Sequence, residues 1–280
     1  MREAHMLEWS GGDGRVALDV VPLEVLGALT RLRLRLLRRI DALPASDAEL
    51  PTRCTEWRAV DLVNHLADTT QWASDALAAA AAGQTSIEIF AAGFDPVATP
   101  KRLTDAVARD LDQARARLHA AIDANLRQVP GGVLLLDRPT PTPLGPQPLP
   151  VALLHLLWDT WLHERDMFLG SVPEQEDEVR LCAIYTLRML GLMFALRRRE
   201  RSLLVELRGA TDVSLRLDVR GGETVVRGVD SVDDGVPILR GDAATVVDAL
   251  TGRGDVDAAL DGPAEARRGL SSLSRLLAGR

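Results

Sequence analysis

Apolar residues recur every three to four positions along the first 200 residues, with polar residues on the opposite face. This spacing is typical of amphipathic helices that bury one side. In the first such segment, residues 22–43, leucines and an isoleucine lie on one face and arginines lie on the opposite face. Five helices are predicted in this way, over residues 22–43, 59–82, 100–127, 150–169 and 174–198.

The pattern changes to strict alternation after residue 200. Residues 203–208, 213–219 and 223–229 alternate apolar and polar side chains, which predicts strands, and residues 236–240 are a candidate fourth strand. Gly221-Gly222 separates two of these runs by two residues, the signal of a tight hairpin. Two helices are expected afterwards, over 242–251 and 263–278, with Asp242 as the N-cap of the first.

This order of elements predicts an α+β protein of two parts. A helical bundle over residues 21–199 is followed by a small α+β domain over residues 200–280, with the joint at Arg197–Arg201. Residues 1–20 carry glycines and little periodicity, so we interpret them as an N-terminal extension. Residues 130–150 hold seven of the fifteen prolines, which favours a packed loop or lid beside the next helix.

Composition and charge narrow the class of protein. The 280 residues carry a formal charge of −7 and a pI near 5.3, which argues against nucleic acid as the main partner. Two cysteines cannot form a disulfide framework, and the first residues do not read as a signal peptide, so we expect a cytoplasmic protein. No apolar run is long enough for a membrane helix, and we interpret the basic face of residues 22–43 as solvated rather than membrane-bound.

The candidate chemistry lies on the predicted helix over 150–169. His155, Asp159 and His163 recur at i, i+4 and i+8, so neighbouring members share a face. His155 and His163 lie about 12 Å apart along the axis, too far for all three to bind one ion easily. The spacing therefore leaves two alternatives, His155 with Asp159 or Asp159 with His163. His65, near the start of an earlier helix, is the natural third ligand, because two histidines and a carboxylate with open positions form a catalytic metal site.

Each of these residues also has a plainer interpretation. An Asp-x-x-x-His pair on a helix is more often a hydrogen bond than a metal site. Asp166 could orient the imidazole of His163 or form a surface salt bridge with Arg165 or Arg102. Cys54 precedes a helix whose N-terminus would favour a thiolate nucleophile, but a small buried residue is the more common case.

Two blocks of sequence resemble the mycothiol-dependent maleylpyruvate isomerase family. Thr52-x-Cys54-x-x-Trp57 followed by Asp61-Leu62-Val63-x-His65-Leu66 is similar to the family's opening motif. The second block, Asp159-Thr-Trp-Leu-His163-Glu-Arg-Asp166, is similar to the family's acidic-x-x-x-His-x-x-Asp motif. The C-terminal strands and the stretch Ile238–Ala243 also match in outline, so the resemblance covers about residues 22–278.

The resemblance implies a DinB-like up-and-down four-helix bundle with a divalent metal, usually zinc, and a sterol-carrier-like C-terminal domain. Carried over, the ligands and hence catalytic residues are His65, Asp159 and His163, with His155 as a neighbour. The family often has Glu at the acidic ligand, where this chain has the shorter Asp159, and Thr55-Glu56 stands where Pro-Gly is usual. The Pro-rich segment is specific to this chain, and we expect it to border the metal side because it leads into the ligand helix.

The resemblance implies an enzyme in which the metal activates a low-molecular-weight thiol, mycothiol, that attacks a small electrophilic metabolite. The reaction would be an isomerisation or an S-transfer, and Arg227 or Arg240 could hold a substrate carboxylate. The alternatives are a thiol-independent or metal-free biosynthetic enzyme, and a non-enzymatic binder of metal or a small ligand. We expect a monomer or homodimer whose partners are the small molecule and the thiol, with neither nucleic acid nor a membrane.

Overall fold

The computed structural model describes residues 6–11, 14–91, 95, 98–107, 110–132, 138–168, 172–230 and 235–277. The chain divides into two compact units. One comprises Leu26–Val172, which we call the helical unit. The other combines Met1–Val25 with Pro173–Arg280, and we call it the sheet unit.

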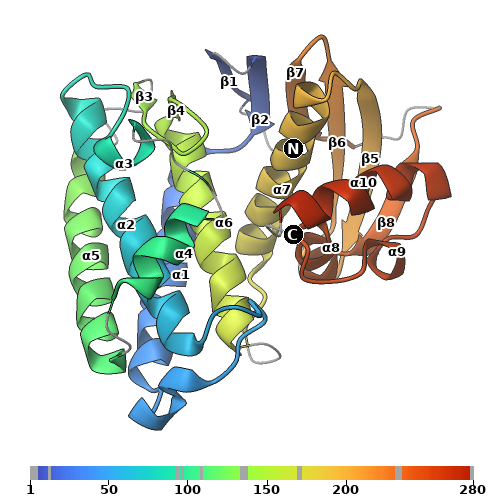
Figure 1. The fold of residues 1–280 in the computed structure, drawn as a ribbon. Helices are drawn as coiled ribbons and strands as arrows, with labels where there is room; N and C mark the ends of the chain where they lie inside the picture. The colour runs from blue at the N-terminus through green and yellow to red at the C-terminus, as the bar shows by residue number, and fades with distance from the viewer. Residues whose placement is uncertain are drawn as a thin grey trace. The chain divides into compact units, whose positions relative to one another are not determined.

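The helical unit is built from long helices that run side by side (Figure 1). They are α1 (Pro22–Asp41), whose first turn belongs to the sheet unit, α2 (Ala59–Ala81), α5 (Leu111–Gly132) and α6 (Leu149–Phe168). Shorter elements connect them: η1 (Ala45–Glu49), α3 (Glu88–Ala91), α4 (Ala98–Asp105) and the hairpin of β3 (Pro139–Thr140) and β4 (Gln147–Pro148).

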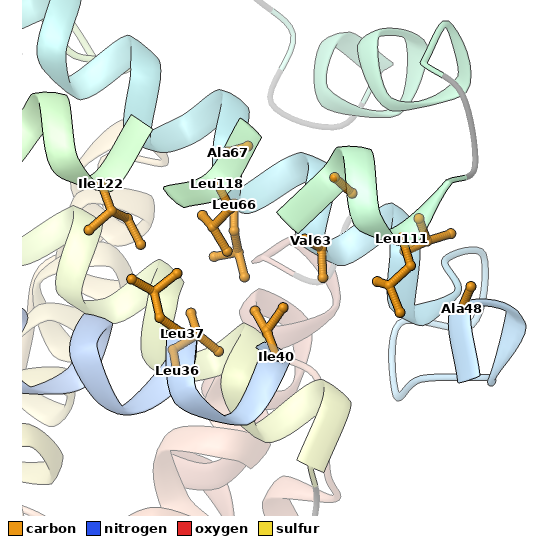
Figure 2. Packing of buried hydrophobic residues seen from close by; sticks show 12 residues of the cluster. Leu36, Leu37, Ile40, Ala48, Val63, Leu66, Ala67, Leu111, Leu118 and Ile122 are labelled. Carbon is orange, nitrogen blue, oxygen red and sulfur yellow. The ribbon is translucent and has the colours of Figure 1, made fainter. Parts of the chain in front are cut away.

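Leucine, isoleucine and valine side chains from α1, α2 and α5 meet in one core cluster (Figure 2). Burying each such side chain stabilises the fold by about 1.5–3 kcal/mol relative to leaving it exposed. The larger members of the cluster are Leu36, Leu37, Ile40, Val60, Val63, Leu66, Leu111, Leu118 and Ile122. The helices predicted from apolar spacing therefore pack against one another through the same apolar faces that predicted them.

One predicted helix is wrong in its length. Residues 100–127 do not form a single helix, because α4 ends at Asp105 and α5 begins at Leu111. The physical cause is Asp110, whose carboxylate accepts a hydrogen bond from the Gln113 backbone N–H at 2.9 Å and so starts a new helix. The apolar spacing continues across Asp110, so it did not indicate that a new helix starts there.

The sheet unit contains one mixed six-stranded sheet in the order β1-β2-β7-β6-β5-β8. Its central hairpins are antiparallel, whereas β2 pairs parallel with β7 and β5 pairs parallel with β8. The strands are β1 (Met6–Gly11), β2 (Gly14–Asp19), β5 (Arg201–Arg208), β6 (Val213–Arg220), β7 (Glu223–Gly228) and β8 (Ile238–Asp242). The helices are α7 (Glu176–Leu196), α8 (Ala243–Leu250), α9 (Val256–Ala259) and α10 (Ala264–Leu277).

The predicted hairpin and cap are confirmed. Gly221 and Gly222 join β6 to β7 with φ values of 56° and 84°, which a two-residue turn with both central residues left-handed requires. Asp242 caps α8 by accepting a hydrogen bond from the Thr245 backbone N–H at 2.9 Å. Helix α7 packs against β6 and β7, and α8 and α10 pack against α7 (Figure 1).

The structure differs from the expected boundaries at both ends. Residues 6–11 and 14–19 are the strands β1 and β2, where an extension was expected. Helix α7 belongs to the sheet unit, whereas the expected joint lay after it, at Arg197–Arg201. Periodicity shows that α7 is buried on most sides, but it does not show which element buries it.

The α+β class is confirmed. The finer description, a DinB-like up-and-down bundle and a sterol-carrier-like domain, stays a prediction. Contrary to the expectation that no apolar segment is long enough, one described helix, α7, has the length and composition to cross a membrane, and 78% of its most apolar window is buried in the structure. Such burial is typical of a core helix.

Candidate metal centre

Two helices of the helical unit bring three of the predicted site residues together. His65 projects from α2, and Asp159 and His163 project from α6. Asp159 Oδ1 lies 3.4 Å from His163 Nε2 and 3.7 Å from His65 Nε2. The two imidazole rings meet edge to face with their centroids 4.8 Å apart. The structure therefore brings Asp159 together with His163 and His65, and the role of the three as metal ligands stays a prediction.

Local sequence explains why these side chains face one another. The Arg58 backbone N–H donates to Asp61 Oδ2 at 2.8 Å, which starts α2 and places His65 in its second turn. On α6, Asp159 and His163 are four residues apart and share a face, while Leu157 and Trp161 are buried on other sides of the helix.

The geometry of the three residues fits a divalent metal better than a set of hydrogen bonds. Two ligands about 2.0–2.1 Å from a tetrahedral zinc lie about 3.3 Å apart, close to both observed separations. A distance of 3.7 Å is too long for an N–H···O hydrogen bond. Moreover, the second carboxylate oxygen, Asp159 Oδ2, is buried and has no hydrogen-bond partner among the residues that the structure describes. Orphaned acceptors of this kind are expected where a cation belongs.

The electrostatics of the cluster also favour an anionic aspartate. Burial by itself would raise the pKa of Asp159, but the imidazoles of His163 and His65 hold that pKa well below its usual value. Burial likewise opposes a charge on His163, yet Asp159, and hydrogen bonds to Asp166 and Cys54, raise the pKa of His163 well above its usual value. A carboxylate that stays ionised is ready to bind a cation without first losing a proton.

Asp166 orients the imidazole of His163, as one of the two sequence alternatives predicts. Its Oδ2 lies 3.0 Å from His163 Nδ1, which leaves Nε2 directed toward Asp159 and His65. A carboxylate behind a ligating histidine in this way fixes the ring and its tautomer. The alternative of a surface salt bridge to Arg165 or Arg102 does not fit, because Asp166 is only 2% exposed.

The turn before α2 covers the site. The ring of Trp57 lies 4.7 Å from that of His65 and 6.0 Å from that of His163, measured between centroids. The Thr52 hydroxyl bonds the backbone of Cys54 and of Trp57 and so fixes this turn. Trp57 is part of the first sequence block but carried no predicted role, because spacing alone does not show that a turn folds over a helix.

His155 lies apart from this donor set. It stacks near Trp158, with ring centroids 5.9 Å apart, and no group of potential metal ligands among the described residues includes it. A second group does exist, formed by Cys54, His163 and Asp166. Its separations of 3.1 and 3.0 Å are those of hydrogen bonds and are shorter than the spacing of ligands around zinc.

The Pro-rich segment lies away from the metal ligands where it is described. Its hairpin packs against α2 and α6, and Arg138 Nη1 donates to the carbonyl of Ala81 at the last residue of α2. His65 and Ala81 are separated by 16 residues of helix, about 24 Å. The expectation that this segment borders the metal side is therefore wrong for residues 138–148, and residues 133–137 lie outside the described part of the chain.

The predicted substrate-holding arginines lie in the sheet unit. Arg240 on β8 pairs with Glu206 on β5 at 2.8 Å, and Arg227 is an exposed residue of β7. Both project from the strand positions that alternate with the buried ones, so they share the polar side of the sheet. Their role toward a substrate carboxylate stays a prediction.

Comparison with known proteins shows which family the chain resembles. The sequence model of the mycothiol maleylpyruvate isomerase N-terminal domain matches residues 29–168, half of the chain and the part that holds all three candidate ligands. The chain therefore belongs to the mycothiol maleylpyruvate isomerase family.

Solved structures agree with this assignment. Two crystal structures of the mycothiol-dependent maleylpyruvate isomerase, one of them of a histidine-to-alanine mutant, match this chain with a TM-score of 0.61. The match covers 87% of this chain and 93% of that one at 11% identity, so the likeness shows a shared fold. A search of curated protein sequences found no significant match.

Proposed function

We propose that this chain is a metal-dependent enzyme that uses a low-molecular-weight thiol, such as mycothiol. The thiol serves either to isomerise a small electrophilic metabolite or to become attached to it through sulfur, as in an S-transferase. The observation that carries the proposal is the convergence of His65 Nε2, Asp159 Oδ1 and His163 Nε2 at the separations of zinc ligands. Family membership supports the class of reaction.

Each residue of the site has a defined task in this proposal. His65, Asp159 and His163 would hold the metal, and Asp166 keeps the His163 ring oriented. Trp57 lies against both imidazoles and shields them from water on that side. Asp159 keeps 14% of its side chain exposed, so the ligand set stays reachable for a substrate.

Three protein ligands leave a coordination position for a small molecule, as in catalytic zinc sites. A divalent ion bound there would supply the positive charge that keeps a sulfur ligand deprotonated at neutral pH. A thiolate that adds to a conjugated double bond turns it into a single bond that can rotate, and loss of the same thiolate returns the isomer. A thiolate that stays attached gives the S-transfer product instead.

The first test is the metal content of the purified wild-type chain beside His65→Ala and Asp159→Asn. We expect about one zinc or similar divalent ion per wild-type chain, and a loss of at least tenfold in affinity in both variants, because each removes one of three ligands. His119→Ala is the matched control, since His119 also pairs with a carboxylate, Asp41 at 2.8 Å, but on the exposed side of α5.

The second test is the reaction itself. The loaded wild-type chain is mixed with mycothiol and a cis-configured conjugated keto acid such as maleylpyruvate, and the isomer is followed by absorbance. Turnover that needs both metal and thiol supports the proposal. A wild-type chain that binds no divalent ion would rule out thiol activation by a metal and favour the metal-free alternatives. Metal-dependent turnover without thiol would favour Lewis-acid chemistry.

A further inference from the structure

Within the described part of the chain, Asp166 accepts hydrogen bonds from the side chains of His163, Cys54 and Arg53, of which His163 is a proposed metal ligand. His163 Nδ1 and Cys54 Sγ both bond Oδ2, at 3.0 and 3.1 Å. Arg53 Nε bonds Oδ1 at 3.1 Å. The backbone N–H of Arg53 also donates to the carbonyl of Asp166 at 3.1 Å. The turn that precedes α2 is thus tied to α6 by main-chain and side-chain bonds at one residue.

This arrangement fixes both the position and the charge of Asp166. Its side chain is fully buried, and a buried carboxylate is tolerated as an anion only when donors satisfy its oxygens. The guanidinium of Arg53 supplies the opposite charge, and the thiol of Cys54 donates its hydrogen to the oxygen that faces His163. With Oδ2 held as an acceptor, His163 must present an N–H at Nδ1, so the neutral imidazole carries its lone pair on Nε2.

We infer that Arg53 and Cys54 are positioning residues of the metal centre: they clamp Asp166 so that His163 is held with Nε2 free to bind the metal. The inference rests on the metal site proposed above and deepens it. Neither residue was assigned this role from the sequence, where Cys54 was a candidate nucleophile and Arg53 carried no signal.

The turn that carries the clamp is closed by its own backbone contacts. Pro51 and Arg58 form a bridge that closes the base of the turn, and Trp57 N–H donates to the Cys54 carbonyl at 2.8 Å. Asp166 lies one helical turn beyond His163, within reach of its Nδ1. Loss of either donor would let the Asp166 carboxylate turn away from His163. The imidazole could then carry its proton on Nε2 instead of Nδ1, and a protonated Nε2 cannot bind a metal.

The test measures zinc affinity by competition with a chromophoric chelator. The variants are Asp166→Asn, Arg53→Gln, Cys54→Ala and Cys54→Ser. We expect a tenfold to hundredfold loss of affinity for the first three, the range typical of residues that support a metal ligand. Cys54→Ser keeps an O–H donor and should stay within about threefold of wild type.

Glu164→Gln is the matched control for a broken buried ion pair. Glu164 follows His163 on α6, is also fully buried and binds Arg35 at 2.6 Å, but no described side-chain contact joins its carboxylate to the His163 imidazole. We expect Glu164→Gln to lower the thermal midpoint measured in chelator without changing zinc affinity. The same melts show whether each clamp variant is folded, and Cys54→Ala, at a partly exposed residue, keeps the test decisive if Asp166→Asn does not fold.

The outcomes separate this inference from the proposed function. A wild-type chain that binds no zinc overturns both. Zinc binding that is equally tight in wild type, Asp166→Asn, Arg53→Gln and Cys54→Ala overturns the clamp alone. Equal losses in Cys54→Ser and Cys54→Ala, together with a thiolate-to-metal charge-transfer band in the cobalt(II) protein, would make Cys54 a ligand and likewise overturn the clamp.

Discussion

Arg33 is a buried cation in the helical unit whose partners are all uncharged. It is 1% exposed, donates to Asn125 Oδ1 at 2.5 Å and to Thr70 Oγ1 at 3.2 Å, and pairs with no carboxylate among the described residues. Burial lowers the pKa of Arg33 to about 9, which reflects the cost of keeping a charge there. The metal centre, by contrast, surrounds its buried histidines with carboxylates. Of these two clusters, the candidate metal centre holds the carboxylates that a cation site needs, and the Arg33 cluster does not.

Supplying the missing countercharge should stabilise the protein. Asn125→Asp keeps the shape of the side chain and places a carboxylate against Arg33. The Ser74 hydroxyl, which accepts from Asn125 Nδ2 at 3.1 Å and donates to the Thr70 carbonyl at 3.3 Å, can turn its hydrogen to the second carboxylate oxygen. We expect a gain of about 1–3 kcal/mol in the free energy of unfolding at pH 7, measured by urea denaturation, because hydrogen bonds to charged groups are worth about that much.

The pH dependence of the Asn125→Asp gain checks its cause. A carboxylate beside Arg33 has its pKa depressed in the folded state, so its contribution is present above the unfolded value of about 3.9 and is lost as the pH falls through the folded value. The difference between Asn125→Asp and wild type should therefore vanish in acid. A variant less stable than wild type at pH 7 would mean that burying the second charge costs more than the pair gains.

Helix α7 approaches the sheet closely at Gly191. A Cβ at this position would collide with Thr224 Cγ2 on β7 and lie 3.0 Å from Leu217 Cδ1 on β6. A glycine inside a helix normally costs about 1 kcal/mol relative to alanine, so this one is explained by packing. The contact fixes α7 to the sheet and accounts for its place in the sheet unit.

Gly191→Ala should therefore destabilise the protein although alanine is the better helix former. We expect a loss of about 1–3 kcal/mol in urea denaturation, the usual cost of overpacking. Gly27→Ala on α1 is the matched control, because its Cβ would meet only the flexible end of Arg31 at 3.4 Å and should stabilise by up to about 1 kcal/mol. Thr224→Ser, which removes the obstructing methyl group, should recover most of the loss in the double variant. Independent, additive effects would show that the two residues do not touch.

At the scale of elements, the sequence predicted most helices and the central strands because their signals are local. Apolar spacing predicted the ends of α1, α2, α6 and α7 to within a few residues, and the alternation of apolar and polar residues predicted β5, β6 and β7. The break between α4 and α5 was missed because a single capping residue, Asp110, outweighs continuous spacing. The short strand β2 was missed because its partner β7 lies some 200 residues further on.

The same limit applies to the site. The spacing of Asp159 and His163 is local and visible, but the choice against His155 and the partnership with His65 depend on how α2 faces α6. The resemblance to a family supplied that pairing in advance. Contacts made by a turn, such as those of Arg53 and Trp57, leave no periodic signal and came only from the structure.

At the scale of the whole molecule, the sheet is completed by strands from the opposite end of the chain. Strand β2 pairs with β7 through Val16–Leu18, and β1 then pairs with β2. Without β2, the strand β7 would expose an unpaired edge, which is a site for aggregation. The three proposed metal ligands, in contrast, all belong to the helical unit. Stability of the sheet and affinity for metal should therefore respond to different residues.

Leu18→Ala tests this separation. Leu18 is fully buried on β2, so truncation should cost about 2–5 kcal/mol, and amide hydrogens of β6 and β7 should exchange faster while those of α5 keep their protection. Zinc affinity should stay within about threefold of wild type. Leu23→Ala, at a leucine that is 65% exposed, is the matched control and should change neither quantity. If Leu18→Ala weakens zinc binding as much as the loss of a ligand does, the metal centre depends on the sheet, because a substitution confined to β2 touches no ligand.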